Sequence, residues 1–298
     1  MPNLASDPHL RLALGTAQFG QPYGIANQLG QVSLSEAKAI LVHASACGID
    51  TLDTAMAYGH SELHLGQIGV HHWKVVSKLP AMPEGCSDIV QWVADSVEES
   101  LQRLKIKSLY GLLLHRPQQL LERGGDRLYY ALQRLKHEGV VRKIGISASA
   151  PSDLDALCSL FQIDLVQAPF NIVDRRLIDS GWLSRLAEQG IELHTRSVFL
   201  QGLLLMKPGD RPQKFARWSM LWSKLDEWFE HAGVTPVQAC LRYALSFSQI
   251  GKVIVGVENL SQLEEILHAA KRPDLQISDE LNSDDLDLLN PANWATLA

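Results

Sequence analysis

The sequence predicts a single domain, residues 1–298, folded as a (β/α)8 barrel, and three observations support this α/β fold class. Short apolar runs alternate with amphipathic segments along the whole chain. Most runs are continuously apolar, which is typical of parallel strands that helices bury on both faces. No GxGxxG turn is present, so an open dinucleotide-binding sheet is the weaker interpretation.

Eight apolar runs have strand length, and their spacing accommodates successive βα units. Each run is bounded by glycine, by polar residues or by a helical pattern. The predicted strands are Leu12–Leu14, Ile49–Asp53, Lys74–Lys78, Leu109–His115, Lys143–Ser147, Leu165–Pro169, Ile191–Ser197 and Val253–Val257.

The segments between these runs predict helices. In Ser35–Cys47, Ser35 is a plausible N-cap, and Ala37, Ile40, Leu41 and Ala44 share one face. The other predicted helices are Ile89–Leu104, Leu128–His137, Asp153–Phe161, Trp182–Gln189, Met220–His231, Pro236–Ser246 and Asn259–Ala269.

Two stretches depart from this repeat. Met206–Arg217 contains two prolines and a glycine and predicts a long loop after the seventh strand. Such loops often cover the functional site of a barrel. The acidic tail Pro273–Ala298, which contains Trp294, either docks against the barrel or extends over the active face.

Composition narrows the function classes. The chain is 46% hydrophobic and 20% charged with a formal net charge of -6, which argues against nucleic acid or an anionic membrane as the main partner. Cys47, Cys86, Cys158 and Cys240 form no CxxC pair, which favours reduced thiols and no metal site. Without a signal peptide or a membrane-length apolar run, we expect a cytoplasmic protein. Its oligomeric state, monomer or dimer, stays open.

Four ionisable residues fall at the C-terminal ends of the second, third and fourth predicted strands: Asp53, Tyr58, Lys78 and His115. In a (β/α)8 barrel, function sits at this end. A phenol is a poor acid by itself, but a nearby ammonium group stabilises the phenolate. Lys78 can supply that charge, and Asp53 can hold Lys78 in place. His115 can orient a substrate oxygen, so Tyr58 can act as general acid or base while a cofactor supplies the hydride.

Each of the four residues has a structural explanation when taken alone. A loop tyrosine is usually amphipathic surface, a strand-end lysine is usually solvated, a strand-end aspartate often caps a helix, and a lone histidine often sits satisfied in a core. Their occurrence in order, each at the correct strand end, favours a shared catalytic site.

With their flanks, these residues resemble the aldo-keto reductase superfamily from about Leu12 to Ala269. The most specific match is Asp53–Glu62, which reads DTAMAYGHSE. Further matching segments are Leu14–Gly20, Val76–Lys78, Leu113–His115, Ile144–Ser147, Val166–Gln167, Gln201–Leu204, Val255–Asn259 and Gln262–Glu265.

The resemblance implies a barrel that binds a nicotinamide cofactor across its C-terminal face, with the four residues as a catalytic tetrad. It also implies that Ser147 and Gln167 hold the carboxamide. The family's asparagine is replaced by Ala148, and Asn171 is a candidate substitute. The candidate cofactor-binding residues are Gly15, Thr16, Ser147, Gln167, Arg196, Ser197, Phe199, Gln201, Gly202, Gly256, Glu258, Gln262 and Glu265.

Two departures bear on the cofactor. Arg196 stands where the family often stacks an aromatic ring on the nicotinamide. A guanidinium can stack, reach a phosphate or form a salt bridge in the barrel mouth. After the last strand no cation is available for the 2′-phosphate of NADP, and Glu258 would repel it or bind a free ribose. Alternatively, Glu258 and Asn259 only cap the last helix. Both NAD and NADP stay open, with the family slightly favouring NADP(H).

The expected substrate is a small carbonyl or alcohol: an aldehyde, a ketone or a sugar. Phe19, Tyr23, Met56, Met82, Arg116 and Phe170 are the candidate pocket residues. The alternative function is a nicotinamide-binding regulatory protein or subunit with little turnover. A barrel isomerase or hydrolase is remote, because the sequence shows neither a metal-ligand set nor paired catalytic carboxylates.

Overall fold

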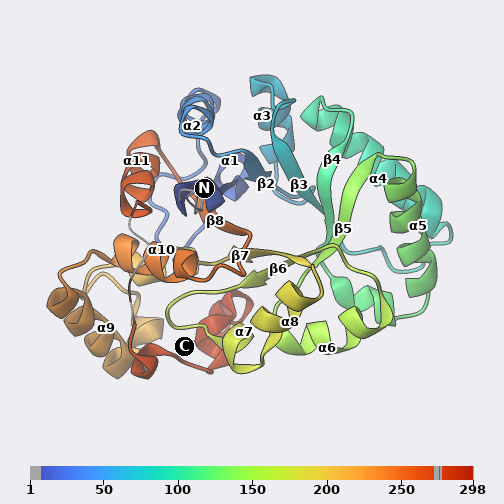
Figure 1. Cartoon of the computed structure of the whole chain (residues 1–298). Coiled ribbons are helices and arrows are strands. Elements are labelled where there is room, and N and C mark those ends of the chain that lie inside the picture. Colours follow the sequence, from blue (N-terminus) through green and yellow to red (C-terminus); the bar gives the residue numbers. More distant parts are fainter. Residues whose placement is uncertain (1–7, 272–274, 276, 298) are drawn as a thin grey trace, which may run out of the picture.

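Eight parallel strands form a closed barrel in the order of the sequence, and helices surround it (Figure 1). The computed structural model describes residues 8–271, 275 and 277–297. The predicted (β/α)8 fold and its single-domain architecture are confirmed. The strands are β1 Leu12–Gly15, β2 Thr51–Asp53, β3 Lys74–Leu79, β4 Leu109–Leu114, β5 Val141–Ser147, β6 Leu165–Pro169, β7 Glu192–Arg196 and β8 Lys252–Gly256.

The register of the strands brings their C-terminal ends to one mouth of the barrel. Gly15 of β1 pairs with Asp53 of β2 on one side and with Gly256 of β8 on the other. Ser147 of β5 likewise pairs with Gln167 of β6. Polar residues at the ends of non-adjacent strands therefore share one rim, as a closed parallel barrel requires.

The predicted helices are present with small changes at their ends, and one helix of the central motif, Ser61–Ile68, was missed. The first long helix begins at Leu34, and its N-cap is Ser33, whose hydroxyl accepts from the amide of Glu36, rather than Ser35. The α-helices are α1 Ala17–Gly20, α2 Leu34–Ala46, α3 Ser61–Ile68, α4 Ile89–Leu104, α5 Gly125–His137, α6 Pro151–Leu160, α7 Arg176–Asp179, α8 Trp182–Glu188, α9 Ser219–Ala232, α10 Pro236–Ser246, α11 Leu260–Ala269 and α12 Leu286–Leu289.

Short 3-10 helices occupy several connections. They are η1 Pro8–Arg11, η2 Pro117–Leu121, η3 Leu200–Leu205, η4 Gln213–Trp218, η5 Asp279–Leu281 and η6 Pro291–Ala295. No helix in the described part of the chain is long and apolar enough to cross a membrane.

Side chains fill the inside of the barrel. Val76, Leu113 and Leu165 form a buried cluster there, separate from the larger core between the strands and the helices. Gly111 leaves room for this packing, because a Cβ on it would lie 2.9 Å from the Leu165 side chain. The barrel is thus a packed core, and any ligand must bind at its mouth.

The acidic tail docks beside α9 instead of covering the active face. The buried Trp294 ring meets the Phe215 ring edge-on at 5.0 Å between centroids. The Lys214 ammonium donates to the Trp294 carbonyl at 3.0 Å. The stretch Met206–Arg217, which was expected to cover the site, lines no part of the pocket. Its second half belongs to η4 and contacts the tail through Lys214 and Phe215. The described part of the tail lines no part of the pocket either.

Candidate active site

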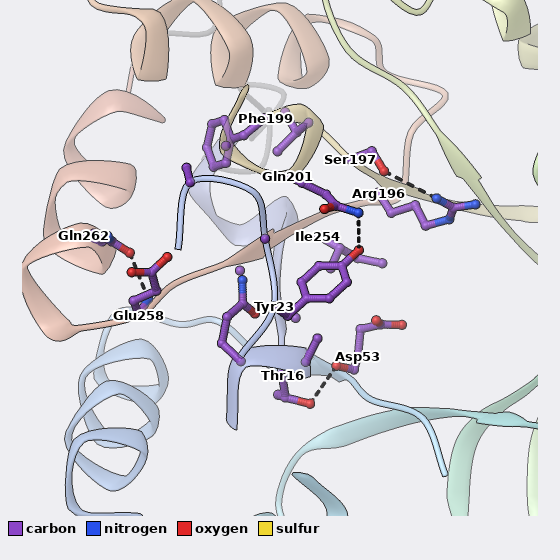
Figure 2. Close-up of a pocket in the computed structure, with 18 of the residues that line it drawn as sticks. Thr16, Tyr23, Asp53, Arg196, Ser197, Phe199, Gln201, Ile254, Glu258 and Gln262 are labelled. Carbon is purple, nitrogen blue, oxygen red and sulfur yellow. Dashed lines mark hydrogen bonds between the residues drawn. The ribbon is translucent and has the colours of Figure 1, made fainter. Parts of the chain in front are cut away.

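An elongated pocket of about 870 Å³ opens at the C-terminal mouth of the barrel. Its walls come from the ends of β1, β2, β5, β6, β7 and β8, together with the loops that follow them. Figure 2 shows Asp53 and Arg196 toward one side of this pocket and Glu258 and Gln262 toward the opposite side. The two ends differ in chemistry.

A buried ion pair lies at the first end. The Lys78 ammonium is fully buried and donates to both carboxylate oxygens of Asp53 at 2.8 Å, and to the Thr54 carbonyl at 2.9 Å. Burial alone would lower the pKa of Lys78, but the charges of Asp53 and Tyr58 raise it overall. Lys78 is therefore held as a cation, and its ammonium lies 4.8 Å from the centre of the Tyr58 ring.

Two glycines allow the loop that carries Tyr58 to approach β1 closely. A Cβ on Gly20 would lie 1.7 Å from the Tyr58 carbonyl, and one on Gly59 would lie 2.3 Å from the Gly20 carbonyl. Gly59 also has a φ of 51°, which favours glycine. These contacts explain why glycine is required on both sides of the contact.

Hydrogen bonds then fasten the same loop. The Ser61 hydroxyl donates to Thr16, and the Thr16 hydroxyl donates to the Asp53 carbonyl at 2.9 Å. The buried carboxylate of Glu62 accepts from Ser77, Ser100 and Arg103 at 2.6–2.8 Å, which ties α3 to β3 and α4. The spacing of the Asp53–Glu62 motif thus has a structural basis in addition to its candidate chemistry.

His115 lies one residue beyond β4 and faces Tyr58. The two rings meet edge-on with 6.1 Å between centroids. Burial, with the charges of Lys78 and Arg196, lowers the pKa of His115 to about 4, although the Asp53 charge opposes them. The imidazole is therefore neutral near pH 7 and carries one N–H that can donate to a substrate oxygen.

Gln167 presents a polar atom that fits a bound amide. Its side-chain nitrogen donates to Asp53 at 2.6 Å, whereas its buried Oε1 receives no hydrogen bond from any described residue. Ser147 pairs with Gln167 across β5 and β6, and both residues line the pocket. A nicotinamide carboxamide offers the NH₂ donor that this buried acceptor lacks, so these residues fit such a cofactor.

Two of the residues that depart from the family pattern, Ala148 and Arg196, contact each other. Ala148 is buried, and its carbonyl accepts from the Arg196 guanidinium at 3.1 Å. The guanidinium also donates to the Ser197 hydroxyl at 3.3 Å. Asn171 does not substitute in the pocket for the missing asparagine. Asn171 is fully buried outside the pocket lining, and its side-chain amide donates to the Ser197 carbonyl at 3.0 Å.

The segment after β7 adopts an unusual backbone. Ser197, Leu200 and Gln201 have φ values of 62°, 47° and 55°, a region that side-chain-bearing residues rarely occupy. The Gln201 carbonyl accepts from the amide of Ala26, and its side chain donates to the Tyr23 hydroxyl at 3.3 Å (Figure 2). The loops after β1 and β7 thus meet across the pocket.

Carboxylates characterise the second end of the pocket. Glu258 and Glu265 both line it, and burial raises the pKa of Glu258. The Gln262 side chain accepts from the Glu258 amide at 2.8 Å, and Asn259 caps α11. The expected capping role therefore applies to Asn259. Among the described residues that line the pocket, the permanently charged cation is Arg196, at the first end.

Most of the predicted site residues gather around this one pocket. Lys78 lies directly behind its wall, buried against Asp53. The predicted residues that line it are Gly15, Thr16, Tyr23, Asp53, Tyr58, His115, Ser147, Gln167, Arg196, Ser197, Phe199, Gln201, Gly202, Gly256, Glu258, Gln262 and Glu265.

Five other candidates for the substrate pocket lie outside its lining. Phe19 and Phe170 are fully buried in the core, where Phe170 stacks with Tyr243 at 5.4 Å. Arg116 is exposed and paired with Glu122. The remaining two, Met56 and Met82, are partly buried against the core.

The sequence alone did not identify several polar lining residues. Gln18, Gln21 and Ser149 come from loops whose direction no local pattern reveals. Thr235 and Pro236 also line the pocket, and here a signal existed, since Thr235 caps α10 with Pro236 at its first turn. That signal located a helix start, and only the tertiary fold shows that this start faces the pocket.

Comparison with known proteins agrees with this geometry. The family model described as Aldo/keto reductase family matches residues 11–283. An uncharacterized oxidoreductase of Bacillus subtilis (strain 168) is 28% identical over 266 residues, covering 81% of this chain and 86% of its own. L-galactose dehydrogenase of Arabidopsis thaliana is 28% identical over 273 residues, covering 85% of this chain and 83% of its own.

Solved structures show the same fold. An aldo-keto reductase from Bacillus halodurans superposes with a TM-score of 0.71 at 20% identity, over 91% of this chain and 89% of its own. A glycerol dehydrogenase from Gluconobacter oxydans has a TM-score of 0.66 at 21% identity, over 91% and 88%. Because the family model spans nearly the whole chain, this protein belongs to the aldo/keto reductase family and is an oxidoreductase that acts on carbonyl and alcohol groups with a nicotinamide dinucleotide.

Proposed function

We propose that this enzyme interconverts an aldehyde, ketone or sugar carbonyl with its alcohol, with Tyr58 as general acid and base. The observation that carries the proposal is the buried Lys78–Asp53 pair directly behind Tyr58. A fixed ammonium beside a phenol stabilises the phenolate that remains after proton donation.

The other residues of the cluster hold the substrate for this proton transfer. The neutral His115 donates a hydrogen bond to the substrate oxygen and limits its position relative to Tyr58. When bound, the nicotinamide supplies the hydride for reduction or accepts it in oxidation. In reduction Tyr58 gives its proton to the oxygen; in oxidation it takes the hydroxyl proton.

We also propose that a hydroxylated substrate binds, such as a sugar or polyol. Polar side chains line the pocket, among them Gln18, Gln21 and Ser149. Such groups exchange hydrogen bonds with several hydroxyls. One curated relative bears the name L-galactose dehydrogenase, which supports this substrate class.

For the cofactor we propose NAD in preference to NADP. The hydride end must lie at Tyr58 and His115, so the adenosine ribose lies toward the opposite end, where Glu258 and Glu265 line the pocket. Two carboxylates repel a 2′-phosphate and can accept hydrogen bonds from ribose hydroxyls. This revises the slight preference for NADP(H) that the family resemblance suggested.

Turnover measured with NADH and NADPH against aldehydes, ketones and sugars tests the reaction. We expect Tyr58→Phe to lower turnover by about 10²–10⁴ while the variant still binds NADH. Equal turnover by the variant would contradict the role of Tyr58. Tight cofactor binding by the wild type with no turnover of any compound would instead support the regulatory alternative.

Parallel titration with NADH and NADPH tests the cofactor preference. We expect Glu258→Gln to narrow the difference between the NADH and NADPH affinities by about tenfold, because the variant lacks one carboxylate that repels the 2′-phosphate. Glu138→Gln, at the exposed C-cap of α5, is the matched control. An unchanged difference in Glu258→Gln would rule out Glu258 as its cause.

A further inference from the structure

Arg196 is a cation without an anionic partner at the reacting end of the pocket. Its guanidinium donates to the Ala148 carbonyl and the Ser197 hydroxyl, both neutral acceptors. Within the described ranges no carboxylate forms an ion pair with it. By contrast, the nearby Lys78 is neutralised by Asp53 at 2.8 Å. The net charge at this end of the pocket therefore comes from Arg196.

The surroundings of Arg196 place this charge beside the nicotinamide ring of the proposed function. Ala148, whose carbonyl holds the guanidinium, directly follows Ser147, and Ser147 and Gln167 form the rim that fits the carboxamide. Hydride transfer also requires the ring to lie against the carbon of the carbonyl that Tyr58 and His115 hold. The Arg196 charge also helps to lower the pKa of His115, which is consistent with a short distance between the two side chains.

We propose that Arg196 sets the redox balance of the bound cofactor by disfavouring its oxidised form. The oxidised nicotinamide ring carries a positive charge, and the reduced ring carries none. An uncompensated cation beside the ring therefore raises the free energy of bound NAD⁺ relative to bound NADH. The pyrophosphate is present in both forms and makes little difference to this comparison.

This bias has a direction. The bound couple takes up electrons more readily, so the equilibrium on the enzyme shifts toward NADH and the carbonyl. In that direction the alcohol transfers a hydride to the cofactor and its hydroxyl proton to Tyr58, which leaves the carbonyl product. The inference rests on the proposed function, and it makes alcohol oxidation the direction that Arg196 assists.

Fluorescence titration with NADH and competitive titration with NAD⁺ test the proposal without turnover. We expect the ratio of the NAD⁺ to the NADH dissociation constant to fall about tenfold in Arg196→Met, equivalent to about 30 mV for this two-electron couple. Arg196→Lys retains the charge and is expected to preserve most of the ratio. Arg134→Met, a surface arginine paired with Glu138, is the control.

Four outcomes separate this inference from the proposed function and from a role in substrate binding. A ratio that falls in Arg196→Met, holds in Arg196→Lys and does not change between pH 6 and 9 supports it, because a guanidinium stays charged throughout. An unchanged ratio in Arg196→Met, with both forms still bound, overturns it alone. A wild-type protein that binds neither form overturns the proposed function as well. If Arg196 instead binds a substrate carboxylate, Arg196→Met will raise KM for acidic substrates and leave the ratio of the two dissociation constants unchanged, which also overturns the inference.

Discussion

The two mouths of the barrel carry similar groups in different states of pairing. At the N-terminal mouth, Lys143, Tyr110 and the buried His194 all contact the carboxylate of Glu192. At the C-terminal mouth, Lys78 and Tyr58 again lie close to a carboxylate, that of Asp53. Among the described residues, however, Arg196 and His115 form no ion pair with a carboxylate, and Oε1 of Gln167 receives no hydrogen bond. Groups satisfied by one another stabilise the fold, whereas groups left available in a pocket await a ligand.

The two lysines give the largest test of this comparison. Lys78→Met leaves Asp53 buried without its counter-ion, so we expect a loss of about 3–5 kcal/mol in the free energy of unfolding and loss of turnover. Lys143→Met leaves Glu192 with its other two partners, Tyr110 and His194, at a partly exposed site, so we expect a loss of about 1 kcal/mol in the free energy of unfolding and normal turnover. Urea denaturation and steady-state kinetics measure both. Equal costs would contradict the distinction between the mouths.

Substitutions of the two tyrosines, Tyr58 and Tyr110, are expected to separate an effect on kcat from an effect on the free energy of unfolding. We expect Tyr58→Phe to lower kcat by about 10²–10⁴ with little change in stability, because it removes the proposed proton donor. We expect Tyr110→Phe to leave kcat unchanged and to cost about 1 kcal/mol, because the 2.7 Å hydrogen bond to Glu192 is lost. A kinetic effect of Tyr110→Phe would show that the N-terminal mouth is coupled to the reaction.

The sequence allowed the barrel and the convergence of Asp53, Tyr58, Lys78 and His115 to be predicted because both depend on local patterns. Continuous apolar runs identify buried strands, and the residues at their ends must converge once the strands are parallel. Pairing across the barrel leaves no such pattern. Tyr110 and Glu192 are 82 positions apart in sequence, and nothing near either residue indicates the other.

Local sequence patterns also could not show which apolar side chains face the pocket and which face the core. Phe19 and Phe170 have the side chains expected of a substrate pocket, but the same apolar character suits the core, where the structure places them. The positive φ values at Ser197 and Gln201 are likewise imposed by tertiary contacts, such as the bond from Asn171 to the Ser197 carbonyl. Neither residue is a glycine that would have signalled such a backbone.

The smallest expected effect is a difference in acid sensitivity between the mouths. Burial alone would raise the pKa of Glu192, but hydrogen bonds from His194, Lys143 and Tyr110 lower it below its usual 4.5. Its stabilising contribution is therefore complete above about pH 4.5 and is lost as the pH falls further. The pKa of His115 is lowered from 6.5 to about 4. Its contribution to the free energy of unfolding is therefore complete above pH 6.5 and is lost as the pH falls from 6.5 to about 4.

These windows separate the two mouths in one experiment. Between pH 6.5 and 4.5, we expect His115→Gln to flatten the decline in stability, because the unfolded wild-type chain alone takes up that proton. Below pH 4.5, we expect Glu192→Gln to reduce the further decline in the free energy of unfolding by about 1 kcal/mol, since a partly exposed carboxylate is partly screened by solvent. Thermal denaturation at pH steps across this range measures both. A flattening by Glu192→Gln above pH 4.5 would mean that its carboxylate is not held ionised by its three partners, and the contrast between this paired carboxylate and the available groups of the C-terminal mouth would fail.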